Sequence, residues 1–132
     1  MKMFFECLVV GFGGFVGSVL RYLVGFIPIN ESSVFPTNTF VINIIGAVLI
    51  SFIAFYITHS TVDQINPSTL KNLILFLKVG VCGGFTTFST FALETGDLIK
   101  TGNNEMAFLY VLLSVVIGVS VIFLPDLIYN RI

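Results

Sequence analysis

Long apolar stretches separated by short polar connections dominate the chain. Four of the stretches reach the length of about 20 predominantly apolar residues that a membrane-spanning helix needs. The connections contain turn-forming residues such as Pro28, Pro36 and the Gly102-Asn103-Asn104 run. The pattern predicts an all-α membrane protein with four transmembrane helices, near residues 4–27, 37–57, 73–91 and 108–128.

The composition supports this class and excludes several others. The 132 residues are 56% hydrophobic and 10% charged, with a mean hydropathy of +1.04, whereas roughly 25% of residues are charged in a soluble domain. The length predicts one domain, residues 1–132. A net charge of −1 without charge runs gives no sign of a nucleic-acid partner. No metal-ligand cluster and no nucleophile–base pair stands out, so we do not expect an enzyme. Cys7 and Cys82 fall in apolar segments, as small core residues do.

The first apolar segment is longer than the apolar region of a typical signal peptide. No Ala-x-Ala cleavage site follows it, and three further spans come after it. We therefore expect this segment to be a retained helix in a multi-pass protein of the cell membrane. At the other end of the chain, we expect Pro125 and Asp126 to end the fourth helix.

The basic residues show only a weak bias between the two sides of the membrane. Lys2, Lys71, Lys78 and Arg131 fall on the side of the termini, and Arg21 and Lys100 on the other. Insertion in both orientations gives such a distribution, and so does chance in a small sample. Because four short helices enclose little volume, we expect an oligomer, most often a twofold dimer.

Small residues predict where helices pack closely. Gly13 and Gly17 form a Gly-x-x-x-Gly pair in the first helix, and Gly46 shares a face of the second with Asn43 and Ala47. Such spacings are ordinary packing surfaces between membrane helices.

Residues 80–91 differ from the rest of the third apolar segment. They contain three glycines followed by Thr-Thr-Phe-Ser-Thr-Phe. We expect Gly83-Gly84 to interrupt the helix near mid-membrane, because glycine resists helical order. The carbonyls that such a break frees need partners and hold Na⁺ in some transporters. The alternative is a kink or a close helix crossing, which the spacing alone favours over an ion site.

Phenylalanines alternate with hydroxyl side chains after the glycines. Phe88 and Phe91 are three apart and share a helix face, and Ser89 and Thr90 lie beside them. A stripe of Phe in a membrane helix normally faces lipid or packs. Ring edges, however, carry positive partial charge, and with hydroxyl donors they could replace the water around a small anion.

Other polar residues in the apolar segments have two interpretations each. Asn43 either bonds to a neighbouring helix or donates its amide N–H to an ion. Arg21 either snorkels to the interface or draws anions into a vestibule. Tyr110 is most simply an interfacial anchor. Glu6 and Glu94 lie near helix ends and are expected to be solvated or interfacial.

Three motifs resemble one known family. Residues 13–22 read Gly-Gly-Phe-Val-Gly-Ser-Val-Leu-Arg-Tyr, residues 43–46 read Asn-Ile-Ile-Gly, and residues 83–91 read Gly-Gly-Phe-Thr-Thr-Phe-Ser-Thr-Phe. With four spans, they make the chain similar over essentially its whole length to the bacterial fluoride-specific ion channels of the Fluc family, also called CrcB. The third motif is highly specific and the first alone is weak. Ala92 stands where some relatives carry a serine.

The resemblance implies an antiparallel, dual-topology homodimer with two fluoride pathways, which passively exports fluoride that entered the cell as hydrogen fluoride. Some bacteria pair two such proteins, so a paralogous subunit is an alternative partner. The resemblance also implies a central Na⁺, not transported, on the backbone carbonyls of Gly83 and Thr86 from both subunits. The implied pathway residues are Arg21, Asn43, Phe88, Ser89, Thr90, Phe91 and Tyr110.

Two rival functions explain less of the sequence. A dual-topology exporter of drugs or cations needs an ionisable residue deep in the first helix, and Glu6 is too near its end. A non-transporting membrane scaffold explains the glycines but leaves the Thr-Thr-Phe-Ser-Thr-Phe run without a purpose. The sequence therefore favours the fluoride channel.

Overall fold

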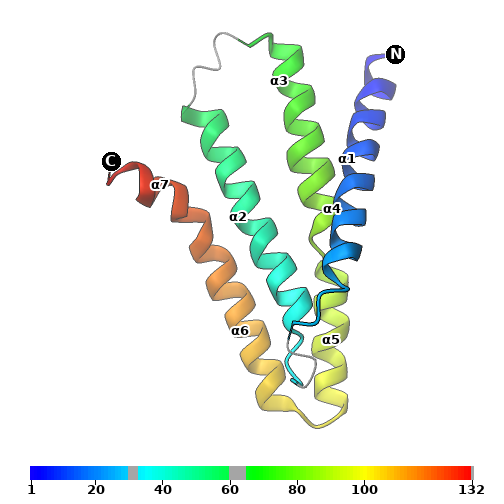
Figure 1. The fold of residues 1–132 in the computed structure, drawn as a ribbon, viewed down its shortest axis with the longest axis vertical. Coiled ribbons are helices and arrows are strands. Elements are labelled where there is room, and N and C mark those ends of the chain that lie inside the picture. Colours follow the sequence, from blue (N-terminus) through cyan, green and yellow to red (C-terminus); the bar gives the residue numbers. More distant parts are fainter. Residues whose placement is uncertain (30–32, 60–64, 132) are drawn as a thin grey trace.

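A computed structural model describes residues 1–29, 33–59 and 65–131, and within them every regular element is helical, without strands. Four helical units are long and apolar enough to cross a membrane, which confirms the predicted four-helix, all-α membrane class. Figure 1 shows the four units as a bundle, and the short turn that joins the third unit to the fourth lies at one end of it. The units are α1 (Lys2–Val24), α2 (Thr37–His59), Pro67–Lys100 and Asn104–Tyr129.

The third unit consists of several helical pieces. It contains α3 (Pro67–Ile74), the π-helical η2 (Leu75–Cys82), α4 (Gly83–Phe85) and α5 (Phe88–Lys100). Asn66 starts it, because its side chain accepts from the Ser68 N–H and a proline follows at the first helical position.

The glycines do not interrupt this unit. Gly83 has right-handed helical angles (φ −65°, ψ −37°), and α4 includes Gly84. The extended residues are Thr86 (φ −82°, ψ 160°) and Thr87 (φ −148°, ψ 110°). Thr87 is the N-cap of α5, and its hydroxyl accepts from the Thr90 N–H at 3.2 Å. The expected position of the interruption was wrong: the extended pair is Thr86-Thr87, three residues after Gly83-Gly84, because both glycines stay helical and Thr87 caps the start of α5.

The fourth unit continues past its proline. It comprises α6 (Asn104–Ser120), the short 3₁₀ turn η3 (Val121–Phe123) and α7 (Leu124–Tyr129). Pro125 lies in the first turn of α7, where its missing N–H costs no hydrogen bond. The expectation that Pro125 and Asp126 end the helix was therefore wrong.

Glycines bring α1 against the third unit, and the two run side by side in Figure 1. A Cβ on Gly13 would lie 2.5 Å from the Phe76 carbonyl oxygen, and one on Gly17 would overlap the Val81 carbonyl. A Cβ on Gly84 would lie 2.5 Å from the carbonyl oxygen of Gly14. Gly84 thus serves a close helix crossing, the alternative that the sequence left open.

The chain buries few side chains by itself. Large apolar residues such as Phe12, Phe15 and Phe108 are exposed, as is usual for surfaces that face lipid or another subunit. One small buried cluster joins α5 and α6 around Leu98, Ala107 and Tyr110.

Candidate functional site

The backbone interruption at Thr86 and Thr87 is bridged from α2 by one side chain. The Thr87 N–H donates to Asn43 Oδ1 at 2.8 Å, and Asn43 Nδ2 donates to the Thr87 carbonyl at 3.2 Å. The Thr86 carbonyl accepts from the Arg21 guanidinium of α1 at 3.2 Å. Gly46 is buried against the Thr86 methyl group, so only glycine leaves room there. Side chains from two helices thus replace the backbone pairing that the extended residues lose.

The hydroxyl groups after the interruption bond among themselves. Thr87 Oγ1 donates to Thr90 Oγ1 at 2.9 Å and lies 3.3 Å from Ser89 Oγ. Thr87 is buried, Thr90 is half-buried and Ser89 is exposed. The cluster caps α5 and also presents hydroxyl groups beside the interruption.

The two phenylalanines lie in different surroundings. Their ring centroids are 5.8 Å apart. The Phe91 ring packs 5.0 Å from the Tyr110 ring, whereas Phe88 is 79% exposed. Phe91 is therefore held by its own chain, while Phe88 projects outward.

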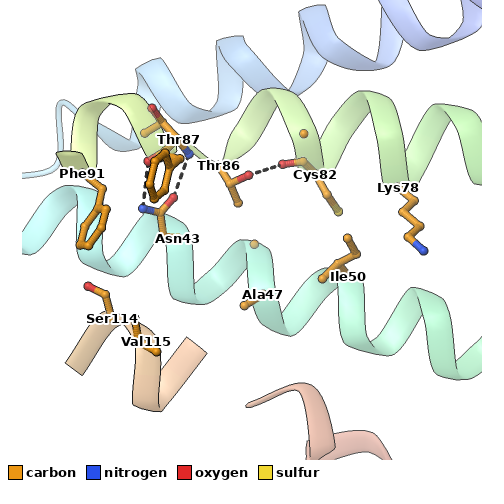
Figure 2. A pocket seen from close by; sticks show the side chains of 13 residues that line it. Asn43, Ala47, Ile50, Lys78, Cys82, Thr86, Thr87, Phe91, Ser114 and Val115 are labelled. Atoms are coloured by element: carbon orange, nitrogen blue, oxygen red, sulfur yellow. Dashed lines mark hydrogen bonds between the residues drawn. The ribbon is translucent and has the colours of Figure 1, made fainter. Parts of the chain in front are cut away.

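A cavity of about 420 Å³ lies against the interruption, between the third unit, α2 and α6 (Figure 2). The residues that line it include Asn43 of α2, Ser114 of α6, and Gly83, Thr86, Phe88 and Phe91 of the third unit. The hydroxyl of Ser114 is buried and has no hydrogen-bond partner among the residues that the structure describes. Ser114 is not among the residues predicted for the pathway, because a single serine in an apolar segment gives no sign that it lines a cavity.

A second cavity, of about 590 Å³, lies on the α1 side of the interruption. Arg21, Thr39 and Thr90 line it, and Thr87 lines both cavities. The structure thus divides the expected pathway residues. Asn43, Phe88 and Phe91 meet in the first cavity, Arg21 and Thr90 in the second, while Ser89 and Tyr110 line neither.

Tyr110 and Glu94 form a buried polar contact that the sequence did not predict. The Tyr110 hydroxyl donates to Glu94 Oε2 at 2.8 Å, and the Thr39 hydroxyl donates to Glu94 Oε1 at 2.7 Å. Tyr110 is fully buried and Glu94 half-buried, so Glu94 is not freely solvated, while the interfacial position expected for both residues stays a prediction. The pairing depends on the packing of α5 on α6, because the two residues are 16 positions apart.

Comparison with known proteins shows the family of this chain. The family model described as "CrcB-like protein, Camphor Resistance (CrcB)" matches residues 8–125. The chain belongs to the CrcB family. Among curated CrcB relatives, one from Chlorobium chlorochromatii is 42% identical over 117 residues, covering 89% of this chain and 86% of the relative.

Other CrcB relatives cover similar shares of the chain. One from Clostridium perfringens is 38% identical, covering 93% of this chain and 91% of the relative. One from Azobacteroides pseudotrichonymphae is 34% identical, covering 90% and 91%. All three are named "Fluoride-specific ion channel FluC". These are names of channels and not of enzymes, and the four apolar units make this CrcB chain a multi-pass membrane protein, consistent with the plasma membrane.

Proposed function

We propose that this chain forms a fluoride-selective channel that passively exports cytoplasmic fluoride. The observation that carries the proposal is the cavity beside the interruption, which groups two phenyl rings with amide and hydroxyl donors. Within the described residues no carboxylate lines it. A site of donors without negative charge suits a small anion, and the names of the relatives identify fluoride as the anion to test.

The route would use these groups in place of water. One N–H of the Asn43 amide is bonded to Thr87, and an amide nitrogen carries two, so the second is available to an ion. The edges of Phe88 and Phe91 carry positive partial charge, and Ser114 adds a hydroxyl. Weak neutral donors release an ion as readily as they bind it, and conduction requires that balance.

A second copy would complete the pathway. Phe88 projects from a chain that gives its ring little cover, so a second copy packed there would present this ring along a closed route. We propose an antiparallel homodimer, because the weak Lys/Arg bias of the sequence is compatible with insertion in both orientations. In each copy the third unit would be interrupted near mid-membrane at Thr86 and Thr87, where the two copies would cross.

We also propose a structural, non-transported Na⁺ at the dimer centre, held by the Gly83 and Thr86 carbonyls. In a continuous helix the Thr87 N–H would donate to Gly83, but here it donates to Asn43, so the Gly83 carbonyl is left for another partner. The Thr86 carbonyl accepts from Arg21 but has a second lone pair. These residues fit half of a Na⁺ site, and the second copy would supply the remaining oxygen ligands.

Fluoride and chloride efflux from liposomes containing the purified chain tests the function. We expect fluoride efflux, with the membrane potential clamped by a potassium ionophore, and little chloride efflux. Equal rates for the two anions, or no fluoride efflux, would reject the assignment. Replacing all Na⁺ with choline tests the ion site, since loss of a bound cation lowers the unfolding temperature. An unchanged unfolding temperature would argue against it.

A further inference from the structure

Lys78 is a charged residue inside the apolar η2 segment, which reads Leu-Phe-Leu-Lys-Val-Gly-Val-Cys. It is the twelfth residue of the unit Pro67–Lys100, which has 34 residues, so it lies about 16 Å from one end of a unit about 50 Å long. With the unit centred in a hydrocarbon core of about 30 Å, its Cα would lie roughly 6 Å inside that core. An ionisable side chain at such a depth is costly and usually marks an ion pathway.

The Lys78 side chain lines the same cavity as the phenylalanines. Figure 2 shows it at the end of the cavity opposite Phe91, with Cys82 and Ile50 between them. Thus the cavity runs from an ammonium group at one end, past the Asn43 amide, to a phenyl ring at the other.

Lys78 has no ion-pair partner among the described residues. The two ion pairs there are Lys71 with Glu6 and Lys100 with Asp97. No carboxylate of the described part of the chain lines the cavity. Its other side-chain polar groups include the second N–H of Asn43 and the unpartnered Ser114 hydroxyl, and both can donate. A cation among donors, without a counter-ion, is an arrangement that binds or attracts an anion.

We infer that Lys78 attracts the permeating anion into this cavity, from the end that faces α3. This inference rests on the proposed function and adds to it a second basic residue, on the opposite side of the interruption from Arg21. The Arg21 guanidinium already donates to the Thr86 carbonyl, whereas the Lys78 ammonium makes no hydrogen bond among the described residues. Lys78 is an exposed residue that lines a mostly apolar cavity, and a positive charge in such a place raises the local concentration of anions beside it.

Charge variants test this role through the rate of fluoride efflux from proteoliposomes. At low ionic strength we expect Lys78→Met to slow efflux about three- to tenfold, and Lys78→Glu to slow it more. Lys78→Arg should stay near the parent rate. The difference in efflux rate between the parent and Lys78→Met should shrink when an impermeant salt shortens the screening length. Lys100→Met is the matched control, because Lys100 is an exposed residue of the same unit, paired with Asp97 and outside the cavity; it should leave efflux unchanged.

A thiol variant adds a second readout, the reactivity of the thiol itself, which is measured without conduction. Lys78→Cys should react from the water phase with an aminoethyl thiosulfonate, which restores an ammonium group of nearly the same length. The treated variant should regain the parent rate, whereas a neutral reagent of the same size should leave it slow. The parent chain, which carries Cys7 and Cys82, is treated alongside as the control.

The outcomes separate this inference from the function on which it rests. Parent efflux with an unchanged Lys78→Met rate at low ionic strength would overturn the role of Lys78 and leave the channel intact; it would indicate that the ammonium snorkels to lipid phosphate. No fluoride efflux from the parent would reject the channel. In that case a thiol that reacts with the charged reagent would still support a water-accessible cation in the cavity, and an unreactive thiol would overturn it.

Discussion

The side chain of Asn43 holds the backbone of Thr87 by two reciprocal hydrogen bonds, at 2.8 and 3.2 Å. An asparagine side chain has the same donor and acceptor as a peptide group, so it can replace a missing backbone neighbour. This explains how two extended residues remain inside an apolar helical unit, where unpaired backbone groups are costly. The sequence offered an interhelical bond and ion donation as alternatives for Asn43. The structure provides the bond and leaves one N–H for the second role.

Asn43→Ala should therefore destabilise the fold as well as the pathway. It leaves the buried N–H and carbonyl of Thr87 without partners, at roughly 1–3 kcal/mol each. We expect a clear fall in the midpoint of thermal unfolding in detergent. Asn104→Ala is the control, because Asn104 is exposed at the start of α6 and its loss should change little. A wild-type midpoint for Asn43→Ala would contradict the bridging role.

Gly17 should tolerate no side chain. A Cβ there would overlap the Val81 carbonyl and lie 2.8 Å from the Phe85 nitrogen, so Gly17→Ala must push α1 away from the third unit. We expect a loss of about 1–3 kcal/mol, typical of overpacking, measured as a lower unfolding midpoint. Gly11→Ala is the matched control in the same helix: nothing lies within 4 Å of its Cβ, and alanine favours helix by about 0.8–1 kcal/mol. Equal effects of the two changes would reject the close approach at Gly17.

The sequence predicts the four apolar units well, because length and hydropathy alone determine them. It predicts the interruption less well. Gly83 and Gly84 are the obvious helix breakers, yet both are helical, since Gly84 is needed for contact with Gly14. The break follows from the Thr87 cap and the Asn43 bridge, and the bridge joins residues 44 positions apart, a contact that local patterns do not encode.

Glu94 and Tyr110 should be energetically coupled. Glu94 accepts from both Tyr110 and Thr39, so Tyr110→Phe leaves one carboxylate oxygen without a partner in a half-buried place. We expect Tyr110→Phe and Glu94→Gln each to lower the unfolding midpoint. The loss of folding free energy in the double variant should be smaller than the sum of the two single losses by about 1 kcal/mol, because the two residues are in direct contact.

The exposed Tyr22 provides the control for this pair. Tyr22→Phe combined with Glu94→Gln should give an additive effect, since Tyr22 is 68% exposed and packs on Phe26. Additivity for both pairs would mean that the Tyr110 contact contributes nothing to stability. Neither residue could be assigned this way from the sequence, where Tyr110 looked interfacial and Glu94 looked solvated or interfacial. A hydrogen bond between helices appears only when their faces are known.

The two phenylalanines of the cavity should respond differently to loss of the ring. Phe88→Ile removes a ring that is 79% exposed, so the isolated chain should fold as before. Phe91→Ile also removes the packing on Tyr110, so it should lower the unfolding midpoint. If the ring edges replace water around fluoride, both variants should reduce fluoride efflux at least tenfold, about 1.4 kcal/mol in the barrier.

Phe108→Ile separates ring chemistry from a general effect on the membrane surface. Phe108 is 69% exposed on α6 and lines neither cavity of the interruption, so its variant should keep the parent efflux. The decisive comparison is Phe88→Ile, because its folding should be unchanged. If that variant elutes at the parent volume and conducts at the parent rate, its ring is a packing surface. If it elutes at the parent volume and conducts slowly, the ring lies on the fluoride route.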